Sequence, residues 1–176
     1  GVGSESTILD GSGSHRIMTI NSSGADTLYI SDFTIQNGHA QTNSGYVIGF
    51  SDGNDEANTI FTNMIMENSG GGTGNTLFRG NGWEKTFYIN CIIRNNSSEN
   101  SAGLGNATVK RSTLYGNSGW NNTSVLLNCN SINCTVYGNA GGFMSNSWTV
   151  GGMGDGIATN CIFWGNEGHG GQQIYN

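Results

Sequence analysis

The sequence predicts an all-β chain wound as a right-handed parallel β-helix, a solenoid of about six to seven rungs. Three observations predict this fold: a seven-residue segment recurs six times, its side chains alternate with a period of two, and Gly and Asn fill the turns. The segments begin 31, 27, 21, 22 and 27 residues apart, the spacing of a solenoid with loops of variable length. The repeats are DFTIQNG (32–38), NMIMENS (63–69), NCIIRNN (90–96), RSTLYGN (111–117), NCTVYGN (133–139) and NCIFWGN (160–166).

Alternation within each repeat assigns its side chains to two faces of a strand. The second and fourth positions are small or apolar in every copy and are expected to face the interior. They are Phe33, Met64, Cys91, Ser112, Cys134 and Cys161, and Ile35, Met66, Ile93, Leu114, Val136 and Phe163. The third and fifth positions are expected to face outward. They are Thr34, Ile65, Ile92, Thr113, Thr135 and Ile162, and Gln36, Glu67, Arg94, Tyr115, Tyr137 and Trp164. Each repeat ends in Asn or Gly, or in the Asn-Ser of the second copy, and Asn and Gly tolerate left-handed turns.

A second set of short apolar segments supplies further strands, so that each unit forms one rung from two or three strands. The candidates are residues 16–20, 46–50, 76–79, 125–127, 143–144 and 173–175. Successive rungs would pair in parallel at roughly 4.8 Å, which gives a molecule about 30 Å long.

Composition agrees with this fold and excludes several partners. The chain of 176 residues has 30 Gly, 25 Asn, no Pro and only 10% charged residues, and a solenoid needs apolar side chains only for a narrow interior. The net charge of −6 argues against nucleic acid and anionic membranes as partners. No apolar run is long enough for membrane insertion. We interpret the only adjacent basic pair, Lys110-Arg111, as a solvated strand edge.

Three of the four cysteines, Cys91, Cys134 and Cys161, fall into the inward second position. Cys91 and Cys134 lie two rungs apart, roughly 10 Å, which is too far for a disulfide. Cys134 and Cys161 lie one rung apart, so a stack of buried thiols and a disulfide between these two both remain open. No CxxC or Cys/His spacing indicates zinc.

The opening segment STILDGSGSHRIMTINSSGADTLYISDFTIQNG (6–38) resembles the first complete rung of bacterial pectin-lyase-like β-helix proteins. The closing GNEGHGGQQIYN (165–176) is similar to the rung start of that group, and the NCTVYGN-type repeats resemble those of polymorphic outer-membrane proteins and related surface adhesins. The resemblance implies an extracellular or bacterial cell-surface location. It also implies that residues 1–176 form a single β-helix domain, a piece of a longer solenoid. We expect its ends to stack on neighbouring rungs or copies, giving end-to-end or lateral homo-oligomers.

Enzymes that cleave polysaccharides share this fold, so the sequence has candidate catalytic residues to consider. Gly168-His169-Gly170 resembles one polygalacturonase motif, but the Asn-Thr-Asp, Asp-Asp and Arg-Ile-Lys partner motifs are missing. The alternative is a lyase site of Asp52 and Asp55 with Arg79 as the base. The same acidic loop is a candidate calcium site, because oxygen ligands are dense there, and a plain solvated turn is the competing interpretation. The four candidate calcium ligands are Asp52, Asn54, Asp55 and Glu56. No other cofactor is expected.

The fifth position becomes aromatic in the last three repeats. We call Tyr115, Tyr137 and Trp164 the lateral strip. Exposed aromatic strips usually mark contact sites. A glycan platform, a core covered by the loop 140–156 with its Trp148, and a contact with another protein are all consistent with it. We therefore expect a non-catalytic adhesive or structural module that contacts a glycan or surface protein through the lateral strip. The alternatives are a fragment of a polysaccharide lyase or glycoside hydrolase, and a self-assembling stalk or filament subunit.

Overall fold

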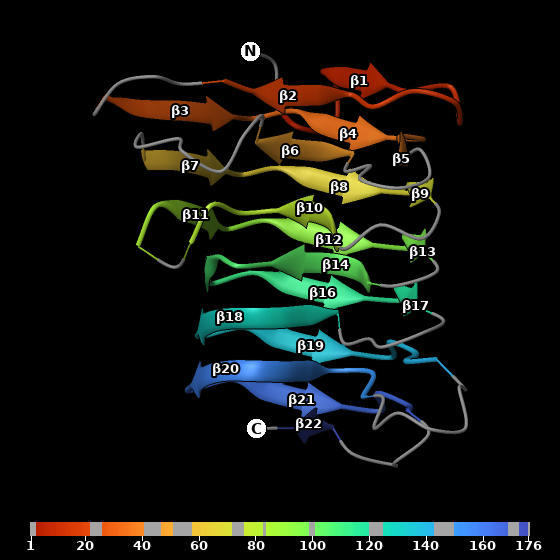
Figure 1. Ribbon diagram of the computed structural model, residues 1–176, viewed down its shortest axis with the longest axis vertical. Helices are drawn as coiled ribbons and strands as arrows, with labels where there is room; N and C mark the ends of the chain where they lie inside the picture. The colour runs from red at the N-terminus through yellow and green to blue at the C-terminus, as the bar shows by residue number, and fades with distance from the viewer. Residues whose placement is uncertain are drawn as a thin grey trace.

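The chain is all-β, and every strand pairing in its sheets is parallel. The computed structural model describes residues 3–21, 26–40, 47–50, 58–71, 76–82, 84–98, 101–119, 125–142, 150–168 and 173–175. Within these ranges there are strands but no helix, and the strands form three sheets. Figure 1 shows the strands stacked along the long axis, from the N-terminal strands at one end to the C-terminal strands at the other. The expectations of an all-β class and of parallel pairing are confirmed.

The repeats build a seven-stranded sheet. Its strands, in spatial order, are β1 (Ile8–Asp10), β4 (Thr34–Gln36), β8 (Ile65–Glu67), β12 (Ile92–Arg94), β16 (Thr113–Tyr115), β19 (Thr135–Tyr137) and β21 (Ile162–Trp164). Each strand holds the third to fifth positions of one repeat, and equivalent positions lie side by side, as with Met66, Ile93 and Leu114. Strand β1 is a seventh copy that the sequence analysis missed, because residues 6–12 (STILDGS) contain no Asn.

Two further sheets carry the strands between repeats. The four-stranded sheet has the order β17 (Ser118–Gly119), β13 (Ser97–Ser98), β9 (Gly70–Gly71) and β5 (His39–Ala40). The eleven-stranded sheet runs through β2 (Met18–Ile20), β6 (Ile48–Phe50), β10 (Thr76–Arg79), β14 (Ser101–Gly105), β18 (Leu126–Ile132), β15 (Thr108–Lys110), β11 (Thr86–Ile89), β7 (Asn58–Thr62) and β3 (Thr27–Ser31), with β20 (Met153–Thr159) and β22 (Ile174–Tyr175) beyond β18. It is continuous because β18 pairs with both β14 and β15.

Most of the second strand set is confirmed. Strands β2, β6, β10, β18 and β22 coincide with five of the six candidates. The sixth candidate, 143–144, lies outside the described residues, and the strand found beside β18 is β20. The strands of the four-stranded sheet were not predicted, nor were β3, β7, β11, β14, β15 and β20.

Every repeat has a residue with left-handed backbone conformation near each of its ends. The first and sixth positions have positive φ in all six copies. The residues are Asp32, Asn63, Asn90, Arg111, Asn133 and Asn160, and Asn37, Asn68, Asn95, Gly116, Gly138 and Gly165. Asn, Asp and Gly adopt this conformation with the least steric penalty, which explains why they recur there.

The inward positions form the core as expected. Met66, Ile93, Leu114 and Val136 are fully buried in the fourth position, and Phe61 stacks on Tyr88 inside with a centroid separation of 4.7 Å. The expectation of an exposed third position is wrong for Thr34 and Ile65, which are also buried. The Thr34 hydroxyl donates to the Ser4 carbonyl, so the N-terminal segment packs against it.

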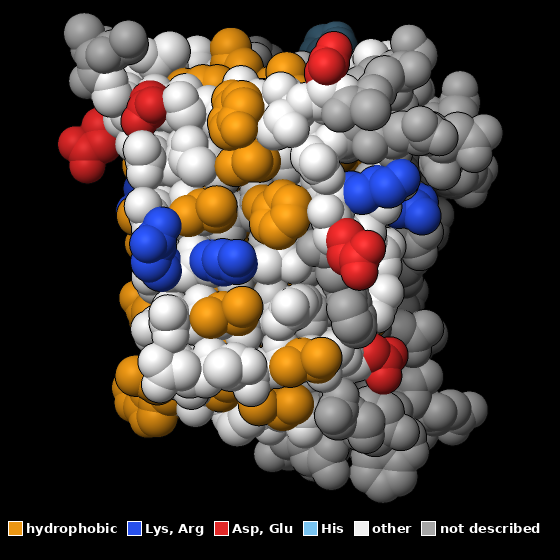
Figure 2. Space-filling model, turned by 90° about the vertical axis from the view of Figure 1, so that its left-hand side faces the viewer, with side chains coloured by type: hydrophobic (Ala, Val, Ile, Leu, Met, Phe, Trp, Pro, Cys, Tyr) orange, Lys and Arg blue, Asp and Glu red, His pale blue; other side chains and the backbone are white. Residues whose placement is uncertain are grey.

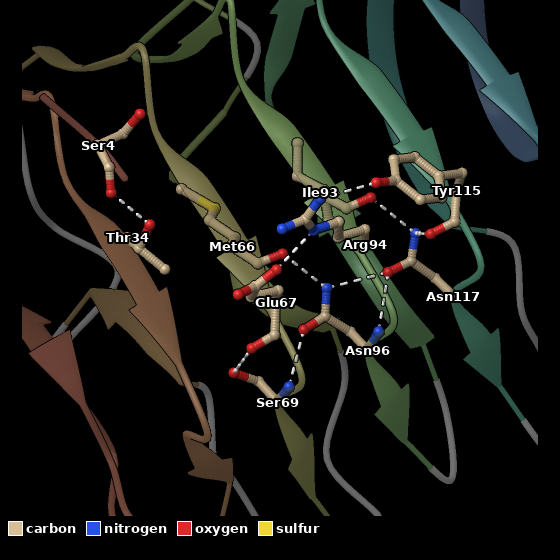
Figure 3. A network of polar contacts seen from close by, with 10 residues as sticks. All are labelled: Ser4, Thr34, Met66, Glu67, Ser69, Ile93, Arg94, Asn96, Tyr115 and Asn117. Atoms are coloured by element: carbon tan, nitrogen blue, oxygen red, sulfur yellow. Dashed lines mark hydrogen bonds and ion pairs between the residues drawn. The ribbon is translucent and has the colours of Figure 1, made fainter. Parts of the chain in front are cut away.

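The seventh position holds a ladder of buried asparagines that the sequence analysis treated only as turn residues. Its members are Asn96, Asn117, Asn139 and Asn166, each at most 3% exposed. Each Oδ1 accepts the backbone N–H of the preceding repeat's member, as from Asn96 to Asn117 at 3.1 Å. Each Nδ2 donates to a buried backbone carbonyl, as Asn117 does to Ile93 at 3.0 Å. Figure 3 shows two of its members, Asn96 and Asn117, bonded to each other, with Ser69 in the same position of the preceding repeat. The ladder satisfies buried polar groups and fixes the register of successive repeats.

Candidate functional site

The structure brings the three residues of the lateral strip together. Tyr115, Tyr137 and Trp164 end strands β16, β19 and β21, and they are direct neighbours in the sheet register. The Tyr115 and Tyr137 rings stack with centroids 5.1 Å apart and planes 9° from parallel. The Tyr137 and Trp164 rings are 6.5 Å apart and tilted by 37°. The aromatic column predicted from the fifth position is therefore present, as a stacked tyrosine pair with a tilted tryptophan beside it.

The stacking decides which ring surfaces a ligand can reach. Tyr137 has an aromatic neighbour on each side, and one face of Tyr115 lies against Tyr137. These two side chains are half-buried, and the faces that stack on each other are closed to a ligand. Trp164 is 71% exposed, so an open ring face exists at this end of the strip. A sugar that lies flat on an aromatic ring can therefore do so at Trp164, but not along the whole strip.

Charged side chains continue the column beyond Tyr115. Arg94 of β12 donates through its guanidinium to the Tyr115 hydroxyl at 3.0 Å and forms an ion pair with Glu67 of β8. Figure 3 shows the three side chains in one row along the outer face of the sheet. The hydrogen bond to Tyr115, followed by that to Glu67, raises the pKa of Arg94. The row holds Tyr115 in place, so this end of the strip is fixed.

Apolar exposure is concentrated at the opposite end. Ile162, in the third position of β21, is 63% exposed and lies two residues from Trp164 on the same face of the strand. The equivalent residues of the two preceding repeats are Thr113 and Thr135, both half-buried. The outer face of the sheet therefore changes from charged, at Glu67 and Arg94, to aromatic along the lateral strip. Its most accessible part is the pair of Trp164 and the neighbouring Ile162.

The acidic loop that was predicted as a lyase or calcium site lies outside the described residues. Asp52, Asn54, Asp55 and Glu56 lie outside the described residues, as do Trp148 and His169. Arg79, the proposed lyase base, is the half-buried last residue of β10. Within the described ranges, no group of three or more His, Cys, Asp or Glu side chains is placed to hold a metal ion.

The inward cysteines are thiols. Cys91, Cys134 and Cys161 occupy the second position as expected, with Ser112 between the first two accepting the Cys91 N–H at 3.1 Å. The Cys134 N–H donates to the Cys161 sulfur at 3.4 Å, and neither forms a disulfide. Burial raises the pKa of Cys91 to about 12 and that of Cys134 to about 11. These thiols are poor nucleophiles and act as small core side chains.

Comparison with known proteins identifies no relative. No family model, no curated protein and no solved structure matches the chain. Among the described residues, no helix has the length and apolarity needed to cross a membrane. The site must therefore be interpreted from its own geometry.

Proposed function

We propose that this chain is a right-handed parallel β-helix module of a secreted or cell-surface protein, and that it serves as a non-catalytic adhesive or structural element. Its partner, a glycan or a surface protein, would contact the lateral strip. The pairing pattern supports the β-helix: each repeat pairs only with the copies before and after it, always in parallel and always in the same register. A chain that coils once per repeat produces this pattern.

The observation that carries the contact proposal is the exposure of Trp164 beside Ile162 at the end of a fixed aromatic stack. Exposed apolar and aromatic side chains that lie together usually mark interaction sites, and Trp is among the residues most enriched at binding hot spots. A row that is held by Arg94 and Tyr115 at one end loses little conformational freedom on binding.

The test is binding of the folded chain to a panel of bacterial, plant and animal glycans, beside a variant with Tyr115, Tyr137 and Trp164 replaced by alanine. Circular dichroism checks that the variant keeps its strand content. Glycan binding that disappears in the folded variant supports a glycan partner. If neither protein binds a glycan, the glycan partner is excluded, and a protein contact or a stalk role is left.

A self-assembling stalk is the second candidate, because both edge strands of the seven-stranded sheet expose apolar side chains. Ile8 and Leu9 of β1 are 50% and 40% exposed, and β21 carries Ile162 and Trp164. Such edges pair readily with further strands. Sedimentation velocity over a range of concentrations tests this: assembly that is independent of any ligand, and weaker in an Ile8→Ser, Leu9→Ser variant, favours the stalk. A monomer at all concentrations excludes it.

A further inference from the structure

A second surface lies on the side of the molecule where β3, β7 and β11 are seen in Figure 1. Figure 2 views this side, and hydrophobic side chains gather along it with basic side chains among them. The strand register places two outward columns on the sheet that β3, β7, β11, β15, β18 and β20 form here. The first contains Tyr29, Ile60, Phe87 and, further along, Ile157; the second contains Ile89, Lys110 and Ile132. Tyr29 is 72% and Ile157 52% exposed. We call these seven residues and Arg111 the basic-apolar face.

Two of the six cationic residues of an acidic chain are adjacent here: Lys110 belongs to the second outward column, and Arg111 is the exposed residue that follows it. The Lys110 ammonium lies 5.8 Å from the centre of the Phe87 ring, and Arg111 is exposed. Among the described residues, neither Lys110 nor Arg111 forms an ion pair with a carboxylate, whereas Arg94 pairs with Glu67. Cations that a protein leaves unpaired beside apolar side chains are complementary to a partner that carries carboxylates.

Arg111 also departs from the residue pattern at the first position of the repeats. It holds the first position of its repeat with φ of 49°, a left-handed conformation that disfavours a long side chain. In the other five repeats this position is Asp or Asn, and several of these side chains bond to one another, as Asn160 does to Asn133 at 2.6 Å and Asn63 to Asp32 at 3.0 Å. Residues that contradict the local pattern without a structural gain are typical of functional surfaces.

We propose that the basic-apolar face is a docking surface for an acidic protein segment, one that presents carboxylates to Lys110 and Arg111 and apolar side chains to the surrounding isoleucines. A protein fits better than a glycan because most of the apolar side chains are isoleucines, which pack against aliphatic groups. A sugar needs open ring faces, and of the two rings on this face only Tyr29 is open, since the Phe87 ring is covered by the Lys110 ammonium. The proposal is independent of the lateral strip, which lies on the seven-stranded sheet.

The experiment uses the random copolymer poly(Glu,Tyr) as a probe, with fluorescence anisotropy at low and high salt. Plain poly(Glu), hyaluronate and phosphatidylserine vesicles are the comparison ligands. The variant is Lys110→Gln with Arg111→Asn; it is expected to fold, because Asn is the residue found at this position in other repeats. Arg16→Gln, which removes a cation from the N-terminal turn, is the matched control.

The expected result is binding of poly(Glu,Tyr) that weakens at least tenfold in the double variant and at high salt, while Arg16→Gln binds as the parent does. Poly(Glu) should bind more weakly, since it has no apolar groups. Equal binding by the double variant would overturn the proposal, as would the absence of binding. Binding restricted to hyaluronate or to the vesicles would assign the face to another class of partner. Self-association that the double variant abolishes would assign the face to a second copy of the chain.

Discussion

Replacing Asn117 with alanine is expected to lower the free energy of unfolding by about 4 kcal/mol. The side chain is 2% exposed, its Nδ2 donates to the Ile93 carbonyl at 3.0 Å, and its Oδ1 accepts the Asn96 N–H at 3.1 Å. Alanine leaves at least these two buried backbone groups without partners. Each unsatisfied buried group costs about 1–3 kcal/mol, so the loss is about 2–6 kcal/mol, with a midpoint of about 4 kcal/mol. The bonds to the Asn96 and Asn139 side chains are lost as well.

This loss in the free energy of unfolding is measured by urea unfolding, with circular dichroism and tryptophan fluorescence as the signals and linear extrapolation to water. The melting temperature should fall by about 8–16 °C, since about 1 kcal/mol corresponds to 2–4 °C in a chain of this size. Asn130→Ala, on the outward side of β18, is the control and should change stability by less than about 0.5 kcal/mol. Asn117→Ser should be intermediate, because Ser69 occupies the same position in its repeat and bonds the Gly38 N–H. If Asn117→Ala is no more destabilising than Asn130→Ala, the ladder of buried asparagines does not stabilise the fold.

Three further predictions concern the corner and the core. Arg111→Asn should raise the free energy of unfolding by about 1 kcal/mol, because Asn tolerates the left-handed conformation; a lower melting temperature would show that the arginine stabilises the native chain instead. Cys91 and Cys129, whose pKa values burial raises to about 12, should react slowly with a thiol reagent at pH 8 and rapidly in urea; equally fast reaction of the native chain would contradict their burial. Because these pKa values lie above the ordinary value of 9.0, folding favours the neutral thiols. Their contribution to the free energy of unfolding is complete below pH 9 and is lost as the pH rises towards 12. The loss is up to about 1.4 kcal/mol per pH unit for each thiol. Between pH 8 and pH 10, the free energy of unfolding should fall less in a Cys129→Ala variant than in the parent chain. An equal fall in the two proteins would refute the raised pKa of Cys129.

The sequence alone predicted the parts of the fold that repeat with a period of two. Inward positions such as Ile93 and Leu114 and the outward aromatics follow from alternation, because side chains on a strand must point to opposite faces. The buried asparagines could not be derived in this way. Asn117 lies beyond the strand, at a corner where polarity predicts exposure, and its burial depends on carbonyls supplied by neighbouring repeats. The recurrence of Asn at the seventh position of four repeats was the available signal.

The lateral strip was predicted as a column, but not its geometry. Register places Tyr115, Tyr137 and Trp164 in line, yet only ring orientation shows that the two tyrosines cover one another and that Trp164 is open. The basic-apolar face was missed because its strands, such as β7 and β11, do not belong to the seven-residue repeat. Lys110-Arg111 was noticed, but its neighbours Phe87 and Ile132 come from strands that pair with β15 only in the folded chain.

The most direct test of the contact proposal is the affinity of single variants at the two ends of the lateral strip, for whichever glycan or protein the parent chain binds. Trp164→Ala should weaken binding by about 30-fold, since hot-spot residues contribute about 2 kcal/mol or more. Tyr115→Phe keeps the ring but removes the hydroxyl that Arg94 contacts, and it should weaken binding far less than Trp164→Ala does. Equal affinities of Trp164→Ala and the parent chain would contradict the proposal that the open end of the strip is the contact site.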